Sequence, residues 1–212
     1  MHPELTICGS TEVVGLVERA AAQGRPFHAV ISIEHPCDET ISLEEGRAPR
    51  LAEAIGPQWQ DRQLILVCWD LEAPHTGIPL PGPEIILKSL EHARAYAPEN
   101  EPLRLLVHCR SGKSRSPAVA LAVLRDAYGR GTEAQCLQEL LRVRPVAAPN
   151  IVLVQHADNI LDCDEALVRA VEADPGITER RAENEAKREH RIESGTYMTY
   201  GHDGQPVHSK LG

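Results

Sequence analysis

The stretch at residues 107–117, which reads VHCRSGKSRSP, constrains this chain more than any other part of it. An apolar run that begins at Leu103 leads into His108 and Cys109, and the pattern of a buried helix begins at Pro117. A strand, a short loop and a helix N-terminus in that order form an anion site, because the N–H groups of the loop converge and the helix dipole adds partial positive charge. The sequence therefore predicts an anion-binding loop directly after Cys109.

The side chains of this loop suit the transfer of a phosphoryl group. Gly112 allows a backbone turn that other residues resist. Arg115 offers a fork of N–H donors to two phosphate oxygens. The same positive field stabilises a thiolate, so we expect Cys109 to be nucleophilic near neutral pH, as transfer through a cysteinyl phosphate requires. The predicted phosphate-binding residues are Arg110, Ser111, Gly112, Lys113, Ser114 and Arg115.

His-Cys, then five residues, then Arg and Ser, resembles the signature of the cysteine-based protein tyrosine and dual-specificity phosphatases. The resemblance implies that Cys109 is the nucleophile and that Arg115 clamps the transferring phosphoryl group. It also implies that His108 helps to tune the thiolate and that Ser116 donates to the sulfur as the sulfur leaves in the second step. The expected reaction is hydrolysis of a phosphomonoester without a metal ion or cofactor.

The resemblance further implies a separate Asp, upstream on a mobile loop, that acts first as general acid and then as base. We predict Asp70 for this role, because it directly follows the apolar run at residues 64–69 and opens a loop rich in Pro and Gly. Glu72 and His75 lie on the same loop and remain alternatives. A strand-end acid that merely caps a turn is the structural alternative for Asp70.

Four apolar runs are typical of buried strands, at residues 5–8, 28–33, 64–69 and 103–107. Helical periodicity is expected at residues 13–20, 49–55, 84–97, 117–128, 133–143 and 151–171. This order predicts a single α/β domain over residues 1–173, with a mainly parallel central sheet of four or five strands and helices on both faces. The strand, helix and strand that precede the signature predict a crossover between neighbouring strands.

The segment at residues 142–161, which reads RVRPVAAPNIVLVQHADNIL, carries a second and weaker resemblance. An Arg-Pro, followed by a Pro-Asn that opens the last core helix, is similar to the dual-specificity phosphatases. The AAPN with its apolar continuation is similar to a group of predicted bacterial tyrosine phosphatases. Its distance from the signature fits the same family.

Residues 174–212 are interpreted as a charged C-terminal tail. The part at residues 178–193 is almost wholly charged, with Ile192 as its only large apolar residue. Such a segment forms either a solvated helix with Glu–Arg pairs three and four residues apart or a disordered tail. The sequence decides neither whether the tail folds over the core or over a second copy, nor the oligomeric state.

Composition limits the partners and the compartment. The formal net charge of -9 argues against a nucleic-acid partner. The six cysteines form no CxxC pair, which indicates free thiols in a reducing compartment. Neither a leader-like start nor an apolar run of bilayer length is found, so we expect a soluble, cytoplasmic protein without stable membrane insertion.

The substrate class is open. Arg110 and Lys113 add two cations to the loop, and phosphoinositide phosphatases of the tensin type carry cations at both equivalent positions. Alternatively, Arg110 points to solvent and Lys113 pairs with an acid such as Asp70 or Glu72. This alternative leaves a phosphorylated protein or a small phosphomonoester as substrate, with phosphotyrosine as the first choice.

Three other classes of protein use a similar loop. A catalytically inactive module that binds phospho-ligands would have no use for the intact Cys, Arg and Ser. A rhodanese-like sulfurtransferase does not require an Arg after five residues. An arsenate reductase needs partner cysteines, which here lie far from Cys109 in sequence. The signature therefore favours the phosphatase over all three.

Overall fold

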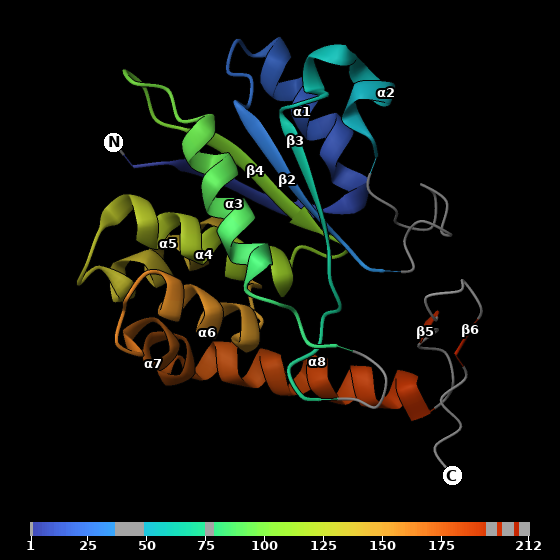
Figure 1. Ribbon diagram of the computed structural model, residues 1–212, viewed down its shortest axis with the longest axis vertical. Coiled ribbons are helices and arrows are strands. Elements are labelled where there is room, and N and C mark those ends of the chain that lie inside the picture. Colours follow the sequence, from blue (N-terminus) through green and yellow to red (C-terminus); the bar gives the residue numbers. More distant parts are fainter. Residues whose placement is uncertain (1, 37–48, 75–78, 194–198, 201–205, 208–212) are drawn as a thin grey trace.

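A computed structural model describes residues 2–36, 49–74, 79–193, 199–200 and 206–207, and side chains up to residue 190. In this part of the chain, four parallel strands form the central sheet in the order β1-β4-β2-β3 (Figure 1). This confirms the predicted α/β class and its mainly parallel sheet. The strands are β1 (Glu4–Gly9), β2 (Ala29–Glu34), β3 (Gln63–Val67) and β4 (Arg104–Cys109).

The predicted crossover between neighbouring strands is wrong. Helix α3 (Glu84–Ala95) leads from β3 to β4, yet β2 lies between these two strands and pairs with both. Burial explains the order, because β2 is buried along its whole length and β4 along all but its first residue. Strand β3 carries the partly exposed Gln63 and the exposed Val67, so it takes the edge.

Helices cover both faces of the sheet. Alternate strand residues enter two separate buried clusters: Ile31 and Leu105 face one, whereas Val30 and Leu106 face the other. The smaller cluster packs against α1 (Val13–Ala22) and α2 (Leu51–Ile55), beside the turn Pro57–Trp59. The larger cluster packs against α3, α4 (Arg115–Tyr128), α5 (Glu133–Val143) and α6 (Ile151–Ile160).

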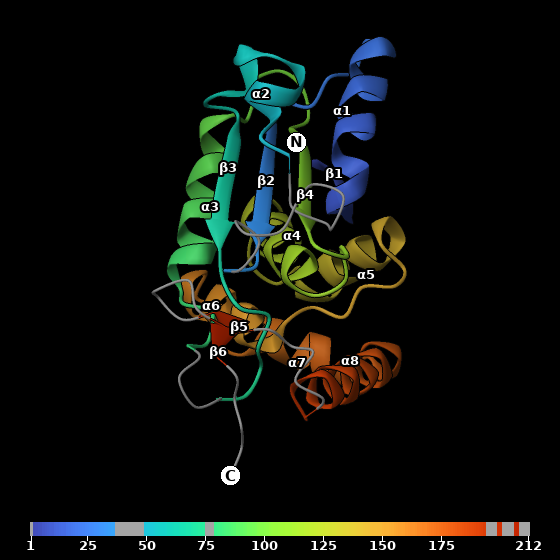
Figure 2. The same ribbon diagram turned by 90° about the vertical axis from the view of Figure 1, so that its right-hand side faces the viewer.

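Helix α4 is the centre of the larger cluster. Each residue from Arg115 to Arg125 is buried, which explains why its sequence is apolar on every side. Its N-terminus stands directly after the carboxyl end of β4, separated by the loop at residues 110–114. Figure 2 shows β2 and β3 pointing toward the end of the domain where α6, α7 and α8 lie.

The single helix predicted over residues 151–171 is interrupted. Residues 161–165 separate α6 from α7 (Ala166–Ala173), and Asp162, Asp164 and Glu165 have positive φ. The buried carboxylate of Asp158 stabilises this break, because it accepts hydrogen bonds at 2.8–3.2 Å from three backbone N–H groups at the start of α7. Periodicity alone does not reveal such a carboxylate cap.

The tail begins with the long helix α8 (Pro175–Glu193), followed by the short paired strands β5 (Thr199–Tyr200) and β6 (Pro206–Val207). In the structure this segment is helical up to Glu193, and the ion pairs Lys187–Glu183 and Arg188–Glu185 join residues four and three apart. Ile177 is fully buried at the start of α8. The helix therefore packs against the core.

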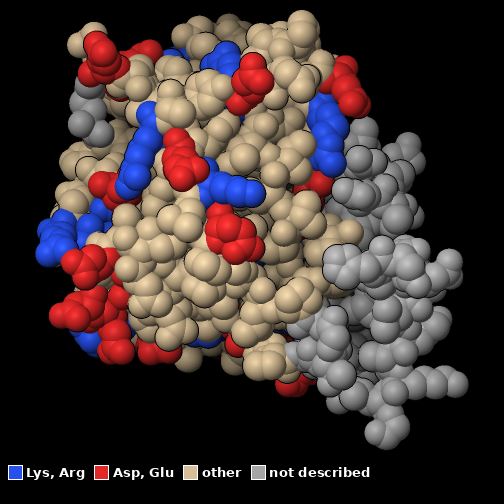
Figure 3. All heavy atoms as spheres, in the orientation of Figure 1, with Lys and Arg blue, Asp and Glu red and all other residues tan. Residues whose placement is uncertain are grey.

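Among the described residues, the helices all lack the combination of length and apolar character that a bilayer span requires. On the face drawn in Figure 3, acidic and basic side chains are interspersed over a largely uncharged surface. The described cysteines (Cys8, Cys68, Cys109, Cys136 and Cys163) are free and buried, whereas Cys37 lies outside the described residues.

Candidate active site

The carbonyl groups of the loop at residues 110–114 all point outward. Each accepts a hydrogen bond of 2.7–3.2 Å, from Ser10 N, Arg144 Nη2, Arg144 Nε, Ala148 N and Asn150 N in that order. In a trans peptide the N–H opposes the carbonyl, so outward carbonyls turn the N–H groups toward the inside of the loop. The tertiary structure thereby makes the loop a cradle of N–H donors in front of the positive end of α4.

Gly112 allows the turn in this cradle, as predicted. Its φ is +67°, and a Cβ added there would lie 2.5 Å from the backbone oxygen of Cys8 on β1. A side chain would therefore suffer both a left-handed backbone conformation and a clash with a buried strand.

Replacing Gly112 with alanine should lower the free energy of unfolding more than the same change at Gly24. Both glycines are left-handed, at φ +67° and +70°, but a Cβ at Gly24 meets nothing within 4 Å. The backbone term alone costs about 1–2 kcal/mol, and only Gly112→Ala adds the clash. Urea unfolding followed by circular dichroism measures both; equal losses would contradict the packing around the loop.

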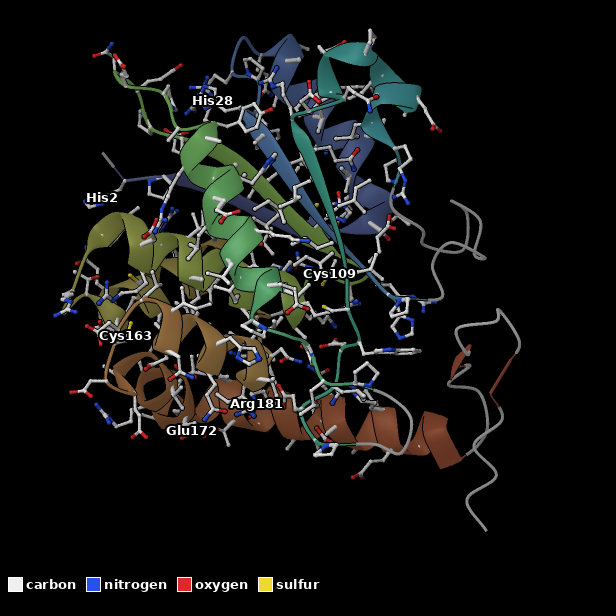
Figure 4. All side chains as sticks on the ribbon, viewed as in Figure 1. His2, His28, Cys109, Cys163, Glu172 and Arg181 are labelled. Atoms are coloured by element: carbon white, nitrogen blue, oxygen red, sulfur yellow. The ribbon has the colours of Figure 1, made fainter. Side chains whose placement is uncertain are left out.

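Cys109 is the last residue of β4 and directly precedes the cradle, at the carboxyl end of the strand (Figure 4). Its side chain is buried, and Ser116 Oγ donates a hydrogen bond to Sγ at 3.2 Å. Ser116 belongs to the first turn of α4, so strand, loop and helix bring a sulfur and a hydroxyl together. The hydroxyl can stabilise negative charge on the sulfur.

His108 lies behind the cradle and is fully buried between the strands. Burial lowers the pKa of His108 to about 4, so its imidazole is neutral at pH 7. Its Nε2 lies 2.7 Å from Ser32 Oγ on the neighbouring strand, and Gln63 Nε2 donates to that hydroxyl at 2.8 Å. The contact with Ser32 fixes the ring behind Cys109.

Arg115 is aimed by the ends of two strands. Its side chain is almost fully buried, and Nη1 donates to the carbonyl oxygens of Glu34 at 2.9 Å and Cys68 at 2.8 Å. Glu34 is the last residue of β2, and Cys68 directly follows β3. The sheet therefore sets the orientation of the guanidinium. A planar group held in this way is a fixed fork for phosphate oxygens.

Asp70 lies beside this guanidinium. Its Oδ1 accepts hydrogen bonds from Ser114 Oγ at 2.7 Å and Asn150 Nδ2 at 3.1 Å, and Oδ2 is 3.9 Å from Arg115 Nε. Burial raises the pKa of Asp70, but the charges of Arg115 and Arg188 and the two hydrogen bonds outweigh it, so the net pKa is lowered. The loop therefore places a carboxylate at the edge of the cradle.

Glu72 binds other partners than Arg115. It accepts a hydrogen bond from Ile151 N at 2.9 Å and forms a largely buried ion pair with Arg181 at 3.0 Å. The third predicted alternative, His75, lies outside the described residues. Of the two acids described, Asp70 is the one that contacts Arg115.

The sequence matches no known family model. Protein phosphatase Slingshot homolog 3 of Rattus norvegicus is 38% identical over 82 residues, which cover 39% of this chain and 11% of that protein. Dual specificity protein phosphatase 1 of Arabidopsis thaliana is 41% identical over 56 residues, covering 26% of this chain and 28% of that protein. The chain thus spans less than a third of either relative.

Two human crystal structures extend the likeness to most of the chain. The tyrosine phosphatase-like serine/threonine/tyrosine-interacting protein aligns with a TM-score of 0.51 and 15% identity, over 74% of this chain and 89% of that one. A variant of DUSP28 aligns with a TM-score of 0.50 and 21% identity, over 76% and 98%. This chain has the dual-specificity phosphatase fold.

In this phosphatase fold, the two extra loop cations are exposed. Arg110 lies at the surface, as expected for the solvent-facing alternative. The predicted pairing of Lys113 with Asp70 or Glu72 is wrong, because those acids bind Ser114, Asn150 and Arg181 instead. Within the described residues, Lys113 forms no ion pair.

Three residues near the cradle were not assigned a role from the sequence. Asn150 caps α6 through Leu153 N and also donates to Asp70 and the Leu71 carbonyl. Arg144 holds two loop carbonyls. The Pro-Asn and Arg-Pro of the weaker resemblance contain both, but their partners are distant in sequence.

The third is His35, which is buried edge-on against Trp69 with ring centroids 4.3 Å apart. Burial, with the charges of Arg115 and Arg110, lowers its pKa to about 3. No sequence pattern marks this residue.

Proposed function

We propose that this chain is a cysteine-dependent phosphatase that hydrolyses phosphomonoesters in two steps. The observation that carries the proposal is the cradle itself, with five outward carbonyls, the Cys109 sulfur directly before it and the anchored Arg115 at its edge. Preorganised donors around an anion are the main source of catalysis in phosphoryl transfer. The partial matches to two phosphatases support the same reaction.

In the first step, Cys109 Sγ attacks phosphorus, the S–P bond forms and the bond to the leaving oxygen breaks. Asp70 gives its proton to that oxygen. In the second step, Asp70 takes a proton from water, the water oxygen attacks phosphorus and the S–P bond breaks. Ser116 donates its hydrogen bond to the sulfur as the thiolate re-forms. Inorganic phosphate leaves, and the enzyme returns to its starting state.

The substrate that we propose is a phosphorylated protein, with phosphotyrosine first and phosphoserine or phosphothreonine second. The exposed cations Arg110 and Lys113 also suit a ligand with several negative charges. A panel of phosphopeptides and phosphoinositides therefore belongs in the same assay. The free buried thiols support the reducing cytoplasm as its compartment.

The decisive experiment is hydrolysis of p-nitrophenyl phosphate by the full chain in the presence of EDTA, together with rapid acid quenching. We expect turnover without metal and a phosphorylated enzyme in the quenched sample. A folded protein that binds phosphate but turns over nothing would instead support a module that binds phospho-ligands.

Asp70→Asn should reduce kcat for phenyl phosphate, a poor leaving group, by about 10²- to 10⁴-fold. Asparagine keeps an oxygen that can accept from Ser114 and Asn150, so the loop should stay in place. p-Nitrophenyl phosphate, whose leaving group needs less help, serves as the control and should lose far less. An unchanged rate on phenyl phosphate would reject Asp70 as the acid.

Wild type and Asp70→Asn should differ in how kcat/KM depends on pH. The acid form of Asp70 is the active one, and the pKa of Asp70 is lowered in the free protein. Hence kcat/KM for phenyl phosphate should rise as pH falls toward that pKa. The ratio of wild type to Asp70→Asn cancels ionisation of the substrate. A ratio that stays constant from pH 7.5 to about 5 would contradict the assignment.

A further inference from the structure

The C-terminal helix α8 lies beside α6 and α7, at the end of the domain toward which β2 and β3 point (Figures 1 and 2). Ile177 anchors its start in the core, and Arg180 Nε donates to the Ala147 carbonyl at 2.9 Å, just before α6. Next along the helix, Arg181 projects from the side that faces the domain (Figure 4). This highly charged helix thus packs on the domain through Ile177, Arg180 and Arg181.

Arg181 makes the contact that reaches the acid loop. Its Nη2 and Nε both donate to Glu72 Oε2, at 3.0 and 3.3 Å. The two side chains are only 19% and 11% exposed, so solvent screens the pair weakly. The partners are separated by 109 residues in sequence, and Glu72 stands two residues after Asp70.

Glu72 in turn is tied to the start of α6. Its other oxygen, Oε1, accepts from Ile151 N at 2.9 Å. Asn150, the preceding residue, donates to Asp70 Oδ1 and to the Leu71 carbonyl, both at 3.1 Å. The segment at residues 70–72 is therefore held at both ends. Asn150 binds residues 70 and 71, and Arg181 and Ile151 N bind Glu72.

We propose that Arg181 is a positioning residue for the general acid, acting from α8 through Glu72 to fix the backbone that carries Asp70. This inference rests on the proposed function. Arg181 touches no reacting atom in this scheme. It adds a charged contact to a loop that Asn150 holds at residues 70–71 and Ile151 N holds at Glu72, and Arg188 on the same helix adds its charge to the field around Asp70.

A positioning role has a specific kinetic signature. Displacing a reacting group by about 1 Å costs on the order of 10²-fold in rate. The loss falls on the step that needs the acid, so it should appear with poor leaving groups and vanish with good ones. We expect Arg181→Gln to lower kcat for phenyl phosphate by about 10- to 100-fold and kcat for p-nitrophenyl phosphate by less than about threefold.

The chain offers a matched control on the same helix. Lys187 pairs with Glu183 on the exposed side of α8, with both side chains about 60% exposed. Lys187→Gln removes the same charge and should leave both rates unchanged. Arg181→Lys keeps a cation beside Glu72 and should restore part of the loss.

The test is a double-mutant cycle on the full-length protein with both substrates. In the Asp70→Asn background, Arg181→Gln should have no further effect on phenyl phosphate, because the group that it positions is gone. Equal losses on both substrates, or a full loss that persists without Asp70, would show a merely structural role and overturn the inference. Thermal unfolding confirms that each variant is folded. Should Arg181→Gln fail to fold, Glu72→Gln breaks the same pair while keeping an acceptor for Ile151 N.

Failure of this inference differs from failure of the proposed function. An inactive wild-type chain overturns both. An active wild type with a strong Asp70→Asn effect and a silent Arg181→Gln overturns the positioning role alone.

Discussion

Cys109→Ser should abolish hydrolysis of p-nitrophenyl phosphate, a loss on the order of 10⁵-fold or more. A serine hydroxyl keeps its proton near neutral pH and is therefore a far weaker nucleophile than a thiolate. The measurement is initial rate with EDTA present, at enzyme concentrations high enough to detect residual turnover.

Phosphate binding provides the control for this variant. The loop carbonyls and Arg115 keep their partners without the sulfur, so Cys109→Ser should bind inorganic phosphate about as tightly as wild type. Calorimetric titration separates the two quantities. Residual activity near that of wild type would mean that another group is the nucleophile.

Arg115→Lys should lower kcat/KM by about 10³- to 10⁵-fold, the range found for arginines that stabilise a transferring phosphoryl group. Lysine keeps the charge but loses the planar fork. Its single ammonium cannot donate to the Glu34 and Cys68 carbonyls and at the same time bind two phosphate oxygens side by side. Kinetics on p-nitrophenyl phosphate measures the loss.

Arg142→Lys is the matched control for Arg115→Lys. Arg142 is an exposed arginine paired with Glu139 on α5, and its replacement should change neither activity nor stability appreciably. If Arg115→Lys retained more than about a tenth of wild-type activity, the orientation of the guanidinium would matter little and charge alone would explain binding.

The most local features could be predicted best. The signature loop, its left-handed Gly112 and the start of α4 lie within a few residues of one another, and short-range geometry decides them. The four strands were likewise visible as apolar runs. Their order was not, because it depends on which strand is most deeply buried, and that is a property of the whole sheet.

The placement of each candidate catalytic side chain is a different matter. Asp70 could be proposed from its position after a strand, but its partners Ser114 and Asn150 lie 44 and 80 residues away. Arg115 is predicted from the sequence as a fork for phosphate oxygens, but its orientation is set by carbonyls at the ends of two other strands. Such contacts leave no periodic pattern in the sequence, because each one needs only a single polar residue at a single position.

The sequence by itself therefore determined the class of fold, the anion-binding loop and the pairing of a cysteine with an arginine across five residues. Only the tertiary structure decided which way the loop carbonyls face, that Glu72 belongs to Arg181 and that the charged tail docks on the domain. The reason is physical. Backbone turns and helix starts depend on neighbours along the chain, whereas buried hydrogen bonds and ion pairs depend on groups that only the packed core brings within 3 Å of each other.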